Sequence, residues 1–376
     1  MNLNNFPAES KIPHRFLLIG GFLGAGKTTL IGLITKDLEK KGLRTALITN
    51  DQGQGLMDTA SARQASQGLS NVAEITGGCF CCRLEELVET IKDLESSGRP
   101  DVMIAEPVGS CTDLMATVLR PLEKVYQTPM TLAPLSVVLD GRRALAALGG
   151  KKNKRSFHRD VGYVFRKQLE EAEWLVINKI DLLEEADLAD LRSRLTKGYP
   201  NKRLFFLSAK TGEGLPEWIS ALLSNESGPG KMMEVDYERY ADGEALLGWV
   251  NLEGTVNGLR DPGEWLLKLA TVIAHSLDHH GHEVGHFKMS LAGGEKRWRA
   301  HQVMSGEEIE LIEEDWAEQG WEPALQILVN LRAEGEAQLL QSYVHQALAG
   351  QTEAQVTLHQ EAAFQPGKPE PTHRIA

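Results

Sequence analysis

The chain has 376 residues, of which 42% are hydrophobic, so it can bury a sizeable core, and its length favours two domains over one. Its 40 basic and 52 acidic residues give a formal charge of −12, which excludes an electrostatic nucleic-acid or membrane binder and favours protein or small-molecule partners. The polar N-terminal stretch has no signal-peptide centre, and charged residues interrupt every apolar run, so we expect a cytoplasmic protein.

Strand and helix signals alternate along the first part of the chain. Short apolar runs predict strands over residues 15–20, 45–50, 101–106, 135–140, 174–178 and 203–208. Helical periodicity predicts helices over residues 28–41, 84–97, 112–126, 161–172 and 186–197. Apolar strands joined by helices indicate an α/β fold with a mostly parallel sheet, whose ligands bind at the carboxyl ends of the strands.

The pattern changes after a turn-rich linker at residues 224–231. Strands are predicted over residues 246–256, 284–291, 297–303 and 325–332, with helices over 262–280 and up to 348 and an acidic helical stretch over 306–318. We therefore predict an N-terminal extension (1–14), an α/β domain (15–223), a smaller C-terminal α+β domain (232–350) and an extended or disordered tail (351–376).

A phosphate-binding loop follows the first strand and opens the first helix. Its glycines let backbone N–H groups turn toward phosphates, its lysine supplies a cation to the β and γ phosphates, and its first threonine offers a hydroxyl to magnesium. The sequence therefore predicts a P-loop NTPase whose phosphate contacts come from Gly21, Gly24, Ala25, Gly26, Lys27, Thr28 and Thr29.

Two further motifs select the base. Asn178, Lys179 and Asp181 follow a buried strand, where the Asp181 carboxylate can accept from guanine N1 and N2 while Lys179 packs over the ring. The next strand ends in Ser208, Ala209 and Lys210, which can complete the pocket. These motifs favour GTP and GDP over adenine nucleotides. The alternative is an ATP-using P-loop enzyme such as a small-molecule kinase.

With these motifs the chain resembles the CobW, UreG and HypB group of P-loop GTPases, and most closely its CobW branch. The segment from Asp101 to Gly109 matches the group's switch motif, with Glu106 before Pro-Val-Gly, and Cys79, Cys81 and Cys82 match the Cys-x-Cys-Cys signature of that branch. The resemblance implies metal delivery or metal-cofactor maturation driven by GTP, with a client metalloprotein as partner. It departs at Asn50-Asp51-Gln52-Gly53 and lacks a long histidine-rich insertion.

We expect hydrolysis by positioning and charge stabilisation rather than by covalent chemistry. Lys27 and magnesium neutralise the phosphates, with Thr28, Glu106 and Asp51 as candidates for the magnesium shell, and Glu106 can also position water. No glutamine follows Gly109 and no arginine finger is identifiable in the sequence. Isolated turnover is therefore expected to be slow.

Three thiols at Cys79, Cys81 and Cys82 form a natural soft-metal site, with zinc as first choice. Because a closed structural site would use four ligands, the incomplete set suits metal transfer. Cys111, beyond the switch motif, is a speculative fourth ligand, and the alternative for it is a small buried residue. A GTP-dependent regulator or reactivator of a cofactor enzyme, with redox-sensing cysteines and no metal transfer, remains the alternative function.

A histidine cluster and a run of basic residues are further candidates for binding sites. The cluster His275, His279, His280, His282 and His286 is read as helix capping or packing at least as readily as a weak metal site. The basic run 151–155 is read as a solvated loop. The sequence leaves a homodimer open and identifies neither the client nor the role of the tail.

Overall fold

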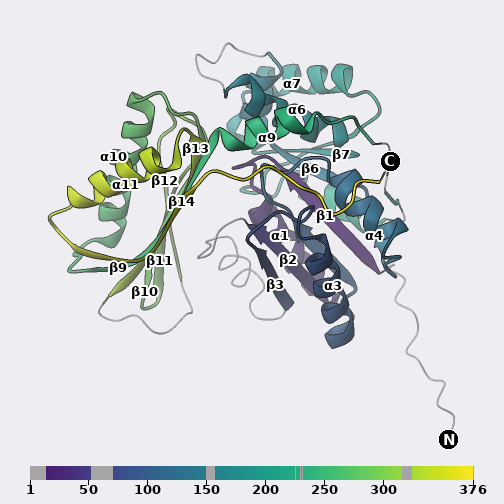
Figure 1. Ribbon diagram of the computed structural model, residues 1–376, viewed down its shortest axis with the longest axis horizontal. Coiled ribbons are helices and arrows are strands. Elements are labelled where there is room, and N and C mark those ends of the chain that lie inside the picture. Colours follow the sequence, from purple (N-terminus) through teal and green to yellow (C-terminus); the bar gives the residue numbers. More distant parts are fainter. Residues whose placement is uncertain are drawn as a thin grey trace, which may run out of the picture.

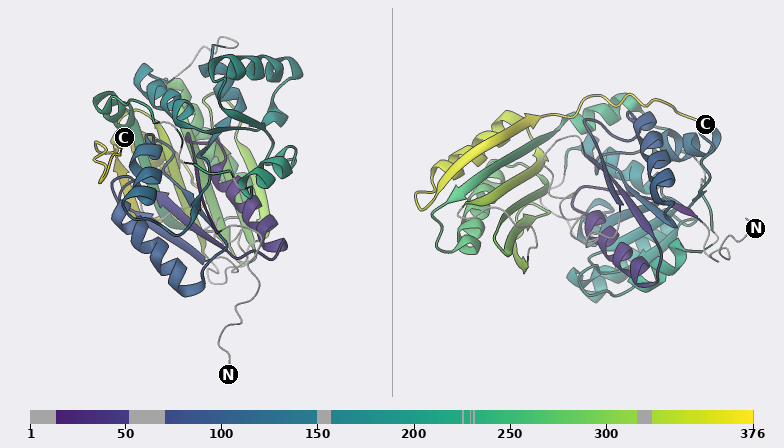
Figure 2. Two further views of the ribbon diagram at one scale, coloured as in Figure 1. Left: turned by 90° about the vertical axis from the view of Figure 1, so that its right-hand side faces the viewer. Right: turned by 90° about the horizontal axis from the view of Figure 1, so that it is seen from below.

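The computed structural model of the protein describes residues 14–51, 71–149, 157–224, 226–228, 230, 232–315 and 324–375. These residues form two lobes, a parallel sheet with helices on both faces and an antiparallel sheet with helices on one face (Figure 1). Figure 2 shows the same two lobes from two further directions. This confirms the predicted fold class, an α/β P-loop fold followed by a smaller α+β unit.

The first sheet has the strand order β3-β2-β4-β1-β6-β7-β8, with β5 paired to β1, and all its pairings are parallel. Its strands are β1 (Arg15–Gly21), β2 (Thr45–Asp51), β3 (Asn71–Thr76), β4 (Val102–Glu106), β5 (Thr131–Leu132), β6 (Ser136–Asp140), β7 (Trp174–Asn178) and β8 (Arg203–Phe206). Every residue of β1 is buried, because helices cover both faces of this central strand.

Helices α1 and α8 pack on one face of this sheet, and α3 to α7 pack on the other. The helices are α1 (Lys27–Lys40), α3 (Leu84–Gly98), the π-helical turn η1 (Met115–Leu119), α4 (Arg120–Lys124), α5 (Gly141–Ala147), α6 (Arg159–Glu171), the 3-10 turn η2 (Ile180–Leu182), α7 (Glu185–Gly198) and α8 (Leu215–Leu222). The strand β3 and the helices α5 and α8 were not predicted. These elements are short, with six, seven and eight residues.

The second sheet is antiparallel, with the order β12-β11-β10-β13-β9-β14. Its elements are α9 (Tyr237–Ala245), β9 (Leu247–Asn257), α10 (Pro262–His279), β10 (Val284–Gly293), β11 (Lys296–Gln302), β12 (Glu310–Asp315), β13 (Leu325–Glu334), α11 (Ala337–Ala349) and β14 (Gln355–Phe364). Helices α10 and α11 pack together on one face of this sheet (Figure 1).

The prediction of a helix over the acidic stretch 306–318 is wrong, because the structure has the strand β12 there. Its acidic side chains lie opposite basic ones on β11: Glu313 and Asp315 pair with Lys296, and Glu314 pairs with Arg299. Cross-strand pairs of opposite charge stabilise a strand pairing that a local pattern cannot reveal.

The tail, which was expected to be extended or disordered, contains a strand. Residues 355–364 form β14, which pairs antiparallel with β9 along its length. The next residues cross to the first lobe, where the backbone N–H of Thr372 donates to the Cys81 carbonyl at 2.9 Å. Figure 1 shows this yellow segment leaving β14 and passing over the first lobe toward α4. Its partners lie nearly 300 residues away in the chain, so the local sequence gave no signal for them.

The helix predicted over 112–126 begins only at Met115, as a π-helical turn. Thr112 and Asp113 are buried and make side-chain contacts, and Asp113 has a left-handed backbone with φ of 64°. These tertiary contacts outweigh the local helical tendency of the segment.

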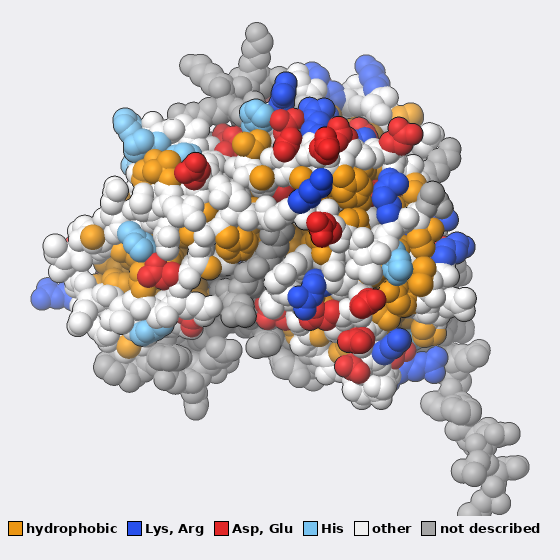
Figure 3. Space-filling view, viewed as in Figure 1, with side chains coloured by type: hydrophobic (Ala, Val, Ile, Leu, Met, Phe, Trp, Pro, Cys, Tyr) orange, Lys and Arg blue, Asp and Glu red, His pale blue; other side chains and the backbone are white. Residues whose placement is uncertain are grey.

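The surface gives no single-sign patch on the face seen in Figure 3, where acidic and basic side chains are interspersed. Among the described residues, no helix combines the length and the apolar character needed to cross a bilayer. The basic run 151–155 lies outside the described residues.

Candidate nucleotide site and cysteine cluster

The phosphate loop joins β1 to α1 at the centre of the parallel sheet. Gly24 and Gly26 have φ of 75° and 92°, a left-handed backbone that a side chain disfavours. Lys27, the first residue of α1, is buried, and its Nζ donates to the Gly21 carbonyl at 2.9 Å. The loop therefore has the backbone shape and the cation that bind phosphates at a helix N-terminus.

Glu106 faces the start of α1 from the carboxyl end of the neighbouring strand β4. The Thr28 hydroxyl donates to its carboxylate, with both oxygens at 3.0 Å, and Lys27 Nζ lies 3.8 Å from Oε1. The structure thus brings together all three residues predicted to be catalytic. A hydroxyl and a carboxylate oxygen this close are hard donors that suit magnesium. Asp51 ends β2, but its side chain lies outside the described residues.

Asn178, the last residue of β7, connects the phosphate loop to the second base-binding motif. Its side-chain amide donates to the Ala25 carbonyl at 2.9 Å, and its Oδ1 accepts from the Ala209 N–H at 3.0 Å. Ser208 is buried, and its hydroxyl accepts from the backbone N–H groups of Lys210 and Thr211. One side chain therefore holds both halves of the nucleotide site in register.

Lys179 was expected to pack over a guanine ring. In the structure its Nζ donates to the Gly24 carbonyl at 2.8 Å and pairs with Asp140 at 2.8 Å. Burial alone would raise the pKa of Asp140, but the charge and hydrogen bond of Lys179, together with the charges of Arg142 and Arg143, lower that pKa. Asp140 was missed in the sequence, since it lies at the end of β6 outside any motif.

Asp181 and Lys210 lie on the surface. Asp181 is exposed on the turn η2, so the expected burial of its carboxylate is not observed and would require a base stacked against it. The exposed Lys210 pairs with Glu310 of β12 at 3.5 Å. The second lobe therefore reaches the base end of the site.

The second lobe also packs against the phosphate loop. A Cβ on Gly24 would lie 2.9 Å from the Gly285 carbonyl oxygen and 3.1 Å from Val303 Cβ. Arg143 of α5 is buried and donates to the carbonyls of Val284, Gly285 and Val303. This contact could not be predicted from sequence motifs, because its acceptors are backbone atoms.

The stretch after Glu106 passes under α6. Gln168 of α6 donates to the Gly109 carbonyl at 3.0 Å and to the Cys111 carbonyl at 2.8 Å. A Cβ on Gly109 would lie 2.7 Å from Leu23 Cδ2, so this glycine lets the stretch approach the phosphate loop. Gln168 was not predicted as a site residue.

The three cysteines of the Cys-x-Cys-Cys motif converge between β3 and α3. The Sγ of Cys79 lies 2.7 Å from that of Cys81 and 3.3 Å from that of Cys82, and the last two are 3.7 Å apart. Among the described residues, this is the group of histidine, cysteine or carboxylate side chains whose ligand atoms all lie within 4.8 Å of one another. Three convergent soft donors match the preference of zinc or copper.

Asn50 holds the cysteine loop from the end of β2. Its amide donates to the carbonyls of Ile75 and Gly78, at 3.0 and 2.7 Å, and its Oδ1 accepts from the Phe80 N–H at 2.9 Å. The cysteine loop is therefore fixed at the carboxyl end of the parallel sheet, the same end at which the phosphate loop lies.

Cys111 is buried and its thiol hydrogen-bonds to that of Cys79, but it does not belong to the group whose ligand atoms all lie within 4.8 Å of one another. Hydrogen bonds from the thiols of Cys111, Cys81 and Cys82 lower the pKa of Cys79 well below its ordinary value. Donation to Cys79 is also the leading cause that raises the pKa of the other three, that of Cys82 to about 11. Cys79 is thus the central sulfur, and Cys111 reaches it from the stretch that follows Glu106.

Two buried carboxyl groups stabilise the turn around Cys111. Glu244 of α9 accepts from the Ser110 hydroxyl at 2.6 Å, and Glu171 of α6 accepts from the Thr112 hydroxyl at 3.0 Å. Burial raises the pKa of each to about 8, and the charge of Asp113 adds to the effect on Glu171. Neither residue belongs to a recognisable motif.

We expect Glu171→Gln to flatten the dependence of stability on pH. Since the pKa of Glu171 is about 8 in the fold and 4.5 ordinarily, the folded protein holds an extra proton between these values. Its contribution is therefore complete below pH 4.5 and lost as pH rises through 8, by at most about 1.4 kcal/mol per pH unit. Chemical denaturation from pH 5 to 9 measures it, with the exposed neighbour Glu170→Gln as control. Identical slopes for the parent and Glu171→Gln would contradict the assignment.

None of the histidines that the structure describes belongs to the cysteine group. His280 Nδ1 lies 2.8 Å from the Ser276 carbonyl at the end of α10, as expected for capping. His282 contacts the Glu334 carbonyl and the Tyr343 hydroxyl. His286 is buried, and burial lowers its pKa well below the ordinary value.

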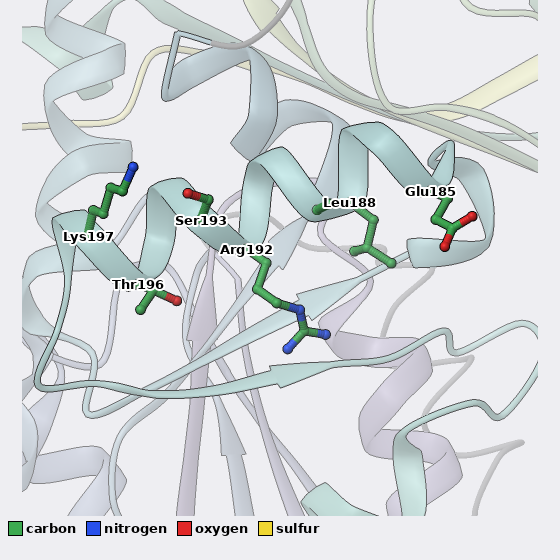
Figure 4. A pocket seen from close by; sticks show the side chains of 7 residues that line it. Glu185, Leu188, Arg192, Ser193, Thr196 and Lys197 are labelled. Carbon is green, nitrogen blue, oxygen red and sulfur yellow. The ribbon is translucent and has the colours of Figure 1, made fainter.

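A shallow hollow of about 490 Å³ lies along α7 (Figure 4). Figure 4 shows side chains of a single helix around it, and none belongs to the phosphate loop, the base motifs or the cysteine cluster. Its lining residues are Glu185, Leu188, Ala189, Arg192, Ser193, Thr196 and Lys197.

A phosphate loop on a central parallel strand, with a carboxylate facing its threonine and a conjoined base-binding motif, defines a P-loop nucleotide-binding protein. Residues 15–206 match the nucleotide-binding domain of the CobW/HypB/UreG family. The chain belongs to this family, as the sequence motifs predicted.

The individual relatives share less than 30% of their aligned residues with this chain. The zinc chaperone CobW of Sinorhizobium sp is 28% identical over 228 residues, which cover 54% of this chain and 61% of the relative. The urease accessory protein UreG of Metallosphaera sedula is 27% identical over 224 residues, covering 54% of this chain and 90% of the relative. The structure of Zn(II)-bound YjiA GTPase from E. coli aligns with 90% of this chain and 98% of its own, at 16% identity and a TM-score of 0.35.

Proposed function

We propose that this chain hydrolyses GTP to drive delivery of a metal ion, zinc by first choice, to a client metalloprotein. The observation that carries the proposal is the covalent path from Glu106, which faces Thr28, to Cys111, whose thiol contacts the central sulfur of the cysteine cluster. Only four residues, 107–110, lie between the two ends of this path. The relative from Sinorhizobium sp is a zinc chaperone, which agrees with the proposal.

In this mechanism Lys27 stabilises charge that develops on the phosphates, and Asp181, Lys179 and the Ser208–Lys210 segment select guanine. Magnesium, when bound, supplies further charge neutralisation beside Thr28 and Glu106. Glu106 also positions the attacking water. Ser110 stands where a water-orienting glutamine would follow Gly109, so we propose slow intrinsic turnover.

The metal is the cargo, and Cys79, Cys81 and Cys82 hold it. A three-thiol set leaves a position at which a ligand from the client can enter before the metal leaves. Cys111 is proposed as the ligand whose reach depends on the nucleotide. We further propose a cytoplasmic location, where such thiols stay reduced.

The test crosses the metal site with the nucleotide state. Zinc affinity is measured by competition with a chromogenic chelator for the parent and Cys111→Ser, each with GDP and with a non-hydrolysable GTP analogue. For the parent we expect the two nucleotides to change the affinity by roughly 5- to 150-fold, the usual range of coupling between sites. Cys111→Ser should lose most of that difference.

Equal nucleotide dependence in both proteins would rule out Cys111 as the coupling ligand. Absence of zinc binding by the parent would reject metal delivery itself and favour a redox role for the cysteines. Binding of a fluorescent GTP analogue, measured in both proteins, controls for damage to the nucleotide site.

A further inference from the structure

The segment 366–375, which we call the strap, lies against the cysteine cluster. The backbone N–H of Glu370 donates to the Sγ of Cys82 at 3.3 Å, and the backbone N–H and hydroxyl of Thr372 donate to the carbonyls of Cys81 and Cys82, at 2.9 and 3.4 Å. Cys82 is the half-buried member of the cluster, while Cys79 and Cys81 are buried. The strap therefore covers the side by which a partner would reach the sulfur atoms.

A charged contact anchors the strap beyond the cysteines. Arg374 Nε donates to Asp113 Oδ2 at 2.8 Å, and its guanidinium also donates to the Met233 carbonyl at 3.1 Å. Asp113 is 1% exposed, so its carboxylate needs this cation and the Tyr237 hydroxyl, which donates to it at 2.7 Å. The anchor lies two residues after Cys111, in the stretch that follows the switch motif.

The strap binds as an extended peptide binds a groove. It makes backbone hydrogen bonds to Cys81 and, through Ile375, to Ala116 at 2.9 Å. Pro366 and Pro369 are buried, and the His373 ring packs edge-on against Tyr126. Backbone contacts give such a peptide affinity, whereas the side-chain contact to Asp113 gives it selectivity.

We propose that this surface is a docking groove for an extended segment of the client, and that the strap occupies it until the client displaces it. This inference rests on the proposed metal delivery. The client segment is one that places an arginine or a lysine opposite Asp113 and runs past Cys82 with free backbone N–H groups. Displacement exposes Cys82 next to the incoming chain, so docking and metal handover occur at one place.

The test measures the rate at which iodoacetamide alkylates Cys82 in the metal-free protein, with the modified cysteine identified by mass spectrometry. Arg374→Ala removes the anchor and should raise the rate roughly 10- to 100-fold, the factor that a hydrogen bond between charged groups is worth. Lys368→Ala, exposed in the same segment, is the matched control and should keep the parent rate. Thr372→Pro removes the backbone donor to Cys81 and should act like Arg374→Ala.

A synthetic peptide with the sequence of residues 366–375 is then added to Arg374→Ala. We expect it to restore protection of Cys82, and we expect the same peptide carrying Arg374→Ala to fail. Equal alkylation rates in the parent, Arg374→Ala and Thr372→Pro would contradict the proposal that the strap covers Cys82. Equal protection by both peptides would contradict recognition through Asp113. Because the assay uses no metal, its failure is distinguishable from a failure of zinc binding.

Discussion

Asp181→Asn is expected to abolish tight GTP binding and to shift preference toward xanthosine triphosphate. The carboxylate accepts from guanine N1 and N2, and an amide would present a donor to those donors, at a cost of about 2 to 5 kcal/mol, or roughly 30- to 5,000-fold in affinity. Xanthine, with a carbonyl at position 2, accepts from the amide instead. Calorimetric titration with both nucleotides measures the change.

Because Asp181 is exposed in the structure, its replacement should leave the folded state intact, and the melting temperature serves as a check. Glu184→Gln, an exposed carboxylate three residues further on, is the matched control. Unchanged GTP affinity in Asp181→Asn would sink the guanine assignment and revive an adenine nucleotide.

Serine at the cysteine cluster is the other change with a large expected effect. Structural zinc sites of about four ligands contribute apparent binding energies of 10–16 kcal/mol, so each ligand accounts for about 3 kcal/mol, or about 100-fold in affinity. A serine hydroxyl is neither soft nor ionised at neutral pH. Cys79→Ser should have the largest effect, because Cys79 contacts the other three sulfur atoms.

Zinc competition assays on Cys79→Ser, Cys81→Ser and Cys82→Ser measure these losses. Since Cys79 and Cys81 are buried, thermal denaturation and GTP binding are measured alongside to separate loss of metal from loss of fold. Zinc affinity equal to that of the parent in all three variants would refute the cluster as the metal site.

Much of the nucleotide site could be predicted because its residues occur in short motifs that each follow an apolar strand. The phosphate loop, Asn178 and Glu106 each lie at the end of an apolar strand, and parallel strands bring those ends to one edge of the sheet. The convergence of three cysteines within four positions is likewise a local property. Such features depend on chain geometry over a few residues.

The partners of these residues could not be predicted, since each depends on a distant contact. Asp140 meets Lys179 only because β6 and β7 pair in register, and Gln168 reaches Cys111 only because α6 packs beside it. The strap contacts Cys82 from 288 positions away. Backbone acceptors, as for Arg143, leave no trace in the sequence at all.

The close approach of Gly24 to Gly285 has a consequence for how this protein can be engineered or can diverge. A methyl group at Gly24 would meet both the Gly285 carbonyl and Val303, so this phosphate-loop position is restricted by the neighbouring lobe as well as by its own left-handed backbone. Exchanging the C-terminal lobe for that of a relative would therefore place a foreign surface directly on the phosphate loop. A chimaera would have to keep β10 and the β11–β12 connection together with the first lobe, so the boundary of an exchangeable module does not coincide with the linker.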